Sequence, residues 1–158
     1  PAPHYEHSQV GYNYRMSNIL AGVGRGQLRV LSERVRKKRE LYDYYAQLVQ
    51  PFPGLCLAPS EPTDVYSNRW LTTALVDPKL TGGVTREELR LRLEADGIET
   101  RPLWKPLHLQ PVFADCPYSG GTVAEKLFDI GLCLPSSTNM SDLELERIQD
   151  SFGKIFRG

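Results

Sequence analysis

The 158-residue chain carries 19 basic and 19 acidic side chains, and 41% of its residues are hydrophobic. This composition is that of one ordinary globular domain with a hydrophobic core, and it argues against a disordered or coiled-coil chain. The balanced charge argues against a general binder of nucleic acid or membrane surfaces, and no apolar run approaches the roughly 20 residues of a membrane-spanning helix.

The N-terminal third predicts an extended segment followed by one long helix. An extended interface segment is predicted over residues 1–16, of which residues 1–10 show neither helical nor strand periodicity. The chain begins Pro-Ala-Pro without an initiator methionine, as expected for a piece of a longer protein. A helix is predicted over residues 17–50, because Ser17 or Asn18 can cap its start and apolar side chains then recur at helical spacing. Pro51 ends it.

The remaining residues, 51–158, predict a small α+β subdomain. Strands are predicted at Trp70–Val76, Ile98–Arg101 and Gly131–Leu134, which gives a small, mainly antiparallel sheet of about three strands. Three further helices are predicted from S/T-x-x-E capping boxes at Thr85–Glu88, Thr122–Glu125 and Ser141–Glu144. Gly97 ends the first of these helices, and the last buries Leu145, Ile148, Phe152, Ile155 and Phe156. The predicted fold class is therefore α+β, with a long N-terminal helix and further helices packed on the sheet.

Two stretches are unusual for a purely structural domain. The first is "VGYNYRMSNILAGVGRGQL", where Gly22, Gly24 and Gly26 stand inside the predicted helix. A glycine inside a helix costs about 1 kcal/mol relative to alanine, so close approach of another helix, from a second subunit, would explain them. The residues Tyr12–Arg15 just before are placed to touch a partner.

The second stretch is "RPLWKPLHLQPVF", a stiff loop with three prolines. Trp104 and Lys105 sit together on it, beside Arg101, as would suit a phosphorylated, ring-bearing ligand. The equal alternative is that Trp104 fills the core and Lys105 is solvated. His108 is isolated, which is more typical of a loop or interface residue than of a catalytic base.

Other patterns give weaker indications. The charge run Glu33–Glu40 predicts a solvated helix face rather than a nucleic-acid surface, because acidic residues bracket it. His4 and His7 lack a clustered third ligand, so a metal site is not predicted. The three cysteines are far apart and without a CxxC pair, which favours reduced thiols in a cytoplasmic protein. No P-loop or nucleophile-elbow motif is present.

Four stretches together resemble the C-terminal part of the DegT-type sugar aminotransferases: "GYNYRMSNILAGVGRGQLRVLSERVRKKRELYDYY", "NRWLTTALVD", "GIETRPLWKPLHLQPVF" and "GLCLPSSTNMSDLELERI". The resemblance covers nearly the whole chain. It implies a fragment of a homodimeric, fold-type I enzyme that uses pyridoxal 5'-phosphate to move an amino group from glutamate to a keto-sugar attached to a nucleotide. Within the family, "NRWLTTAL" and "RPLWKPLHLQPVF" are most similar to enzymes that aminate UDP-linked 4-keto-6-deoxy N-acetylated sugars, as in bacillosamine synthesis.

The resemblance also implies roles for particular residues. Asn13 matches the family asparagine that reaches into the neighbouring subunit's site and hydrogen-bonds the cofactor phosphate, and Arg15 matches an interface arginine. Tyr12 and Tyr14 accompany them at this interface. The residues implied to border the sugar-nucleotide site are Arg101, Trp104, Lys105 and His108.

The family's Schiff-base lysine belongs to its large N-terminal domain, and no lysine here stands in that context. The resemblance therefore implies that this chain is inactive alone and binds no cofactor by itself. The alternative is a stand-alone regulatory or protein-interaction module that keeps the fold without the reaction.

Overall fold

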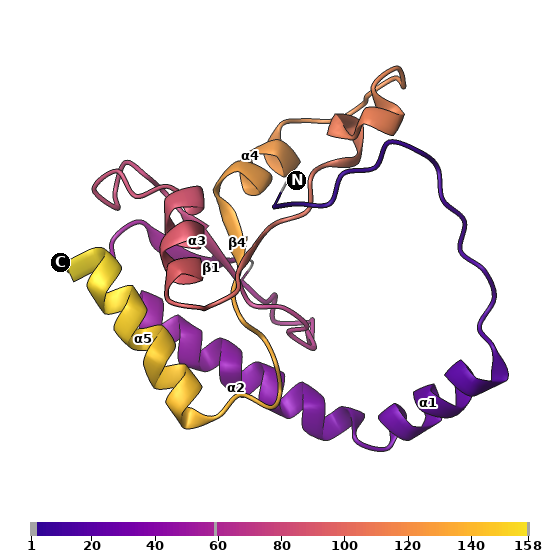
Figure 1. Ribbon diagram of the computed structural model, residues 1–158, viewed down its shortest axis with the longest axis horizontal. Helices are drawn as coiled ribbons and strands as arrows, with labels where there is room; N and C mark the ends of the chain where they lie inside the picture. Colours follow the sequence, from indigo (N-terminus) through magenta and orange to yellow (C-terminus); the bar gives the residue numbers. More distant parts are fainter. Residues whose placement is uncertain (1–2, 59, 158) are drawn as a thin grey trace.

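The computed structural model describes residues 3–58 and 60–157, shown in Figure 1. Five α-helices lie in these residues: α1 (Asn18–Leu28), α2 (Leu31–Val49), α3 (Arg86–Ala95), α4 (Val123–Ile130) and α5 (Asp142–Arg157). The strands are β1 (Leu55–Ala58), β2 (Thr73–Val76), β3 (Arg101–Pro102) and β4 (Gly131–Cys133), and two short 3₁₀ turns, η1 (Leu107–Leu109) and η2 (Pro111–Phe113), follow β3. The predicted α+β class is confirmed.

The strands form one sheet in the order β1-β2-β4-β3, and every neighbouring pair is antiparallel. The antiparallel prediction is confirmed, but β1 was missed because its four residues lie between turn-forming segments. The strand predicted from Trp70 begins only at Thr73. The strand predicted over Ile98–Arg101 forms ladder pairs only at Arg101 and Pro102.

The register separates the two faces of the sheet. Ala74 pairs with Leu132, and Leu55 pairs with Val76, so these buried side chains share one face. Cys133 is the register partner of Arg101 and therefore points to the opposite face. The sheet thus presents an apolar face to the core and a mixed face to the loop that follows β3.

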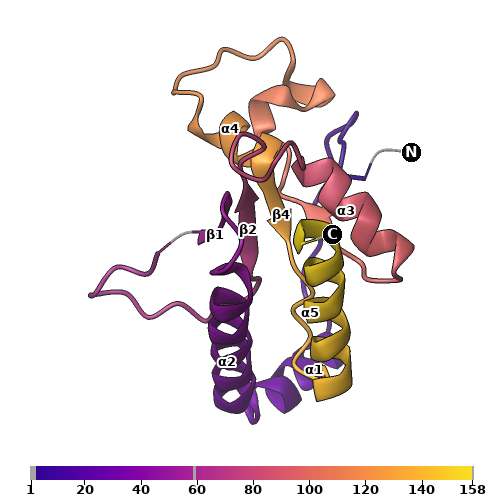
Figure 2. The ribbon, with the colours of Figure 1, turned by 90° about the vertical axis from the view of Figure 1, so that its left-hand side faces the viewer.

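Helices α2, α3 and α5 supply the rest of the core. Figure 2 shows α2 and α5 side by side below the sheet, with α3 beside β4. Their fully buried hydrophobic side chains are Tyr45, Leu89, Leu93 and Phe152. The hydroxyl of Tyr45 donates to the carbonyl oxygen of Pro135 at 2.8 Å, and burial raises its pKa. The predicted apolar face of the last helix is confirmed, with Ile148 buried and Leu145, Ile155 and Phe156 packed against the cluster.

The single helix predicted over residues 17–50 is wrong, because the chain turns between α1 and α2. The amide of Val30 donates to the carbonyl oxygen of Gln27 at 3.2 Å, a tight turn that ends α1. Helix α1 buries no side chain, so no packing holds it in line with α2. The predicted N-cap is confirmed, since the Ser17 hydroxyl accepts from the amide of Leu20.

Two of the three predicted capping boxes are present. Thr85 and Glu88 bond each other reciprocally, and Ser141 and Glu144 do the same at the start of α5. The box at Thr122 is wrong: its side chain makes no cap bond, and Glu125 is bound elsewhere. Gly97 ends α3 as predicted, with a φ of +70° that favours glycine.

The charge run on α2 is only partly a solvated face. The pairs Glu33–Lys37 and Arg36–Glu40 lie along the surface as predicted. Arg34, in contrast, donates to the side chains of Thr138 and Asn139. Lys38 and Arg39 are not part of a solvated face either, because both bind the loop between β1 and β2.

Phe152→Ala should lower the free energy of unfolding by about 3–5 kcal/mol, because Phe152 is fully buried at the centre of the core. Urea denaturation followed by circular dichroism measures this. Leu143→Ala is the matched control, since Leu143 lies on the same helix with 76% of its surface exposed. The control should change stability by less than about 0.5 kcal/mol. Equal effects of the two variants would contradict the assigned core.

Candidate functional site

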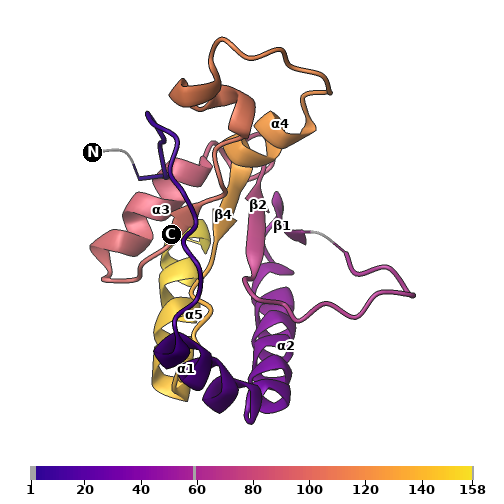
Figure 3. The same cartoon turned by 90° about the vertical axis from the view of Figure 1, so that its right-hand side faces the viewer.

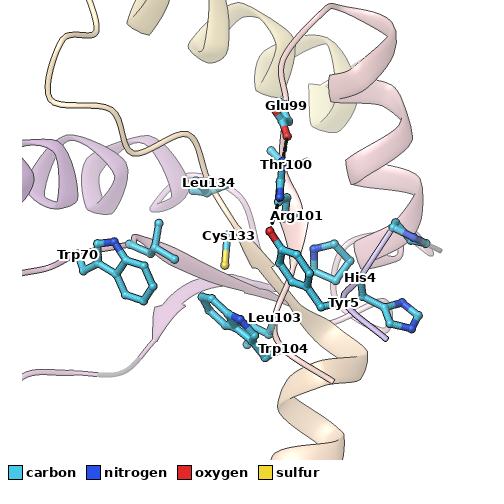
Figure 4. Close-up of a pocket in the computed structure, with 13 residues that line it drawn as sticks. His4, Tyr5, Trp70, Glu99, Thr100, Arg101, Leu103, Trp104, Cys133 and Leu134 are labelled. Carbon is cyan, nitrogen blue, oxygen red and sulfur yellow. Dashed lines mark hydrogen bonds and ion pairs between the residues drawn. The ribbon is translucent and has the colours of Figure 1, made fainter. Parts of the chain in front are cut away.

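A pocket of about 360 Å³ lies beside β3 and β4 (Figure 4). Four segments that are distant in sequence build it, so it exists only in the folded chain. Its lining residues are Pro3, His4, Tyr5, Trp70, Leu71, Glu99, Thr100, Arg101, Pro102, Leu103, Trp104, Cys133 and Leu134. Cys133 contributes its buried thiol to the lining because the register turns it away from the helical core. Burial raises the pKa of this thiol, so it remains neutral.

Two indoles form an aromatic wall of the pocket. Trp70 and Trp104 lie with ring centroids 5.8 Å apart and planes tilted by 33°. They are the two tryptophans of the chain, and 65% and 50% of their surfaces remain exposed. Trp104 therefore stands outside the core, and its surface position agrees with the ligand-facing alternative. Trp70 could not be recognised as a site residue from the sequence, because only the fold brings it to Trp104.

Two cationic groups each have an acidic neighbour: Arg101, which lines the pocket, and Lys105, which follows the lining residue Trp104 in sequence. The Arg101 guanidinium donates to Glu99 at 2.6 and 2.9 Å and to the Tyr5 hydroxyl at 2.9 Å. Hydrogen bonding to Glu99 raises the pKa of Arg101. The Lys105 ammonium group lies 3.2 Å from Glu6 and lowers the pKa of that carboxyl. The carboxylate partners of both pairs are solvent-exposed, so an anionic ligand can compete with them for the two cations.

A buried carboxamide fixes the loop that carries these cations. Gln110, only 3% exposed, accepts from the amide of His7 at 2.9 Å and donates to the carbonyl oxygens of Tyr5 and Lys105. The amide of Val112 donates to the carbonyl oxygen of His7 at 3.1 Å. Residues 3–7 are therefore strapped to the loop after β3. The sequence gives only a weak indication of this role, because Gln110 is a single carboxamide in an apolar stretch that contains prolines.

His108 lies apart from the pocket. Its Nε2 atom is 2.8 Å from a carboxylate oxygen of Glu125 on α4, and its ring stacks on Tyr118 at 3.9 Å. This contact explains why Glu125 does not cap α4. Of the four predicted residues, Arg101 and Trp104 line the pocket, whereas Lys105 and His108 do not; His108 lines a separate hollow with Tyr118.

The residues predicted to meet a second subunit are exposed. Tyr12, Asn13, Tyr14 and Arg15 lie on an extended segment that runs away from the body of the chain in Figure 1. A Cβ atom added at Gly22, Gly24 or Gly26 would meet nothing within 4 Å in the part of the chain that the structure describes. The faces of this segment and of α1 are therefore open to a partner.

The side chain predicted to bind the cofactor has the chemistry that a phosphate ligand needs. The exposed carboxamide of Asn13 can donate to a phosphate oxygen. Lys38 is engaged as a structural group, since its ammonium donates to the carbonyl oxygens of Trp70 and Ser136 and burial lowers its pKa. Among residues 3–58 and 60–157, no three His, Cys, Asp or Glu side chains cluster as a metal site, and no helix could span a membrane.

Comparison with known proteins decides the family. Residues 2–153 match the DegT/DnrJ/EryC1/StrS aminotransferase family. The chain belongs to this family. Among its relatives is the Bacillus subtilis (strain 168) protein named "Putative pyridoxal phosphate-dependent aminotransferase EpsN", 45% identical over 99% of this chain and 40% of that protein. GDP-perosamine synthase of Escherichia coli O157:H7 is 33% identical over 96% of this chain and 40% of its own length.

The solved structures agree with this DegT-family assignment. The aminotransferase TlmJ from Streptoalloteichus hindustanus superposes with a TM-score of 0.76 at 28% identity, covering 88% of this chain and 36% of that one. DesI, crystallised in the presence of its TDP-sugar product, gives a TM-score of 0.77 at 25% identity over 90% of this chain. The chain spans about 40% of the length of the curated relatives it matches.

Gln110→Leu should loosen the strap that joins residues 3–7 to the loop after β3. Losing these hydrogen bonds leaves the amide of His7 without its acceptor, at a cost of about 1–3 kcal/mol. Amide hydrogen exchange at His7 and Val112 should therefore speed up. Gln149→Leu is the matched control because Gln149 is exposed on α5. Unchanged exchange in Gln110→Leu would show that the carboxamide does not hold the strap.

Proposed function

We propose that this chain is the C-terminal part of a pyridoxal phosphate-dependent aminotransferase that moves an amino group from glutamate to the 4-keto group of a UDP-linked deoxy sugar. The observation that carries the proposal is the family match over residues 2–153. Relatives named as a pyridoxal phosphate-dependent aminotransferase and as a GDP-perosamine synthase support both the cofactor and the sugar-nucleotide class. In this proposal the Schiff-base lysine comes from the rest of the protein, so the isolated chain neither binds the cofactor nor catalyses the reaction.

Pyridoxal phosphate, when bound, supplies the electron sink that makes amino-group exchange possible. This chain's part is to hold the cofactor's phosphate from the neighbouring subunit, through the Asn13 carboxamide. The exposure of Asn13 on an extended segment supports this role. Tyr12, Tyr14 and Arg15 would lie at the same subunit interface, where the open glycines of α1 let a partner helix approach.

The pocket beside β3 would border the sugar nucleotide. Arg101 and Lys105 can donate charge-assisted hydrogen bonds to its diphosphate when their ion pairs with Glu99 and Glu6 are broken. Trp104 offers an exposed aromatic face to a ring. His108 would act farther along the loop, where it holds the loop to α4 through Glu125.

The proposal places the enzyme in the cytoplasm, as free Cys56, Cys116 and Cys133 favour. The alternative, a regulatory or interaction module that keeps the fold, predicts no dependence of cofactor or nucleotide binding on these residues. The two variants below separate the two functions.

Asn13→Ala in the whole aminotransferase should weaken cofactor retention about ten- to a hundredfold, because one hydrogen bond to a charged phosphate is worth about 1.5–3 kcal/mol. Equilibrium dialysis against pyridoxal phosphate measures the affinity. Asn139→Ala is the control, since the Asn139 side chain contacts Arg34 of its own chain. Equal affinities of wild type and Asn13→Ala would remove Asn13 from the phosphate site.

Lys105→Ala should raise the KM for the nucleotide sugar by about five- to a hundredfold and leave the glutamate half-reaction nearly unchanged, because glutamate carries no diphosphate. Single-turnover measurements separate the two half-reactions. Lys79→Ala, at an exposed lysine outside the pocket, controls for the lost charge. Equal losses in both half-reactions would mean that Lys105 serves the fold and not the substrate.

A further inference from the structure

The loop between β1 and β2 carries Trp70 to the pocket. Residues 60–70, named here the Trp70 loop, project from the body of the chain in Figures 2 and 3. A projecting loop would ordinarily leave its side chains mobile, but Trp70 lies 5.8 Å from Trp104 in a defined orientation. The contacts of the loop with α2 explain how this position is kept.

Glu61 is the centre of these contacts. Its carboxylate accepts both guanidinium N–H groups of Arg39 on α2, at 2.9 and 2.8 Å. It also accepts the backbone amide of Ser67 and lies 3.5 Å from the guanidinium of Arg69. Hydrogen bonding by Arg39, followed by that of the Ser67 amide, lowers the pKa of Glu61 to about 2. The carboxylate is therefore ionised at neutral pH and holds both ends of the loop together.

Arg69 lies between Glu61 and Trp70 in this arrangement, so its conformation determines where Trp70 begins. Its φ of +47° lies in the left-handed region, which is rare for a residue with a side chain and persists only where the surroundings hold it. The guanidinium lies 3.8 Å above the ring of Tyr42 on α2 and against Glu61. The amide of Arg69 donates to the Ser67 hydroxyl at 3.1 Å. The backbone turns sharply at this point, immediately before the indole.

Trp70 itself is held on both sides of its backbone. Its amide donates to the Asn68 side chain at 3.0 Å, and its carbonyl oxygen accepts from Lys38 on α2 at 2.8 Å. With the backbone fixed and the preceding turn set, the indole is directed toward Trp104, as Figure 4 shows. Three side chains of α2, those of Lys38, Arg39 and Tyr42, thus seat the loop.

We propose that Glu61 is a positioning residue of the pocket: by holding Arg69 in its left-handed conformation, it sets Trp70 against Trp104. Glu61 does not line the pocket and would act on a ligand only through Trp70. The expectation that a ring-bearing nucleotide meets this aromatic wall rests on the proposed function. The position of Trp70 does not, so the two can be tested separately.

The experiment compares Glu61→Gln with wild type in the whole protein. Two closely spaced, tilted indoles give an exciton couplet in the circular dichroism near the main indole absorption band, and the part of the signal that Trp70→Phe removes belongs to this pair. Glu61→Gln should reduce that couplet by about half or more, because the carboxamide offers an N–H group where two guanidinium donors converge. The melting temperature and far-ultraviolet helix signal show whether the variant is folded.

Glu40→Gln is the matched control. It removes an exposed ion pair with Arg36 on the same helix and should leave the couplet unchanged. Glu61→Asp, which keeps the charge, should recover part of the couplet. In a titration with UDP, Glu61→Gln should bind about threefold or more weakly, since stacking of a base on one aromatic ring is worth at least that much.

The outcomes separate the two proposals. An unchanged couplet in folded Glu61→Gln, or the same loss in Glu40→Gln, would overturn the positioning role of Glu61 whatever the ligand. A couplet lost in Glu61→Gln alone supports that role. If the couplet is lost but UDP affinity is unaffected in both Glu61→Gln and Lys105→Ala, the positioning role stands and the proposed sugar-nucleotide site is wrong.

Discussion

The register of β4 between β2 and β3 is the constraint on which both the core and the pocket depend. It places Leu132 beside Ala74 on the helical side, and Cys133 beside Arg101 on the other. Because side chains alternate along a strand, a slip of β4 by one residue would turn Cys133 toward the core and Leu132 toward the pocket. The closely packed helices exclude that slip, so the packing of the core also specifies the position of the site.

Helix α2 connects the core and the pocket because its side chains contact both the core and the loop that carries Trp70. Tyr45 belongs to the core, while Lys38 and Arg39 bind the Trp70 loop. A run of mixed charges on a helix predicts a solvated face, and for Arg36 and Glu40 it is one. The difference between these cations lies in what the chain places opposite them. A cation facing backbone carbonyl oxygens or a carboxylate becomes part of the tertiary structure.

The features that the sequence predicted well are those that depend on near neighbours. The capping box at Thr85 and the glycine end of α3 involve residues within one or two turns of each other. The features that it did not predict depend on distant partners. Glu125 binds His108 and leaves Thr122 without its cap partner, and Trp70 meets Trp104, 34 residues away, only in the folded chain. The cationic and aromatic loop after β3 could be recognised from composition, but Glu6, Glu99 and Gln110 could be placed only by the fold.

The hydrogen bonds at Gln110 restrain the motion of the segment that carries Asn13. Residues 8–17 and α1 are held at one end by the bonds of His7 to Gln110 and Val112, and at the other end by α2 (Figure 1). A chain fixed at both ends samples a smaller volume than a free tail, so it loses less conformational entropy when it docks. Residues 8–17 and α1 thus form a loop that is anchored at both ends. A partner that binds this loop at Asn13 is mechanically coupled both to the loop after β3 and to α2.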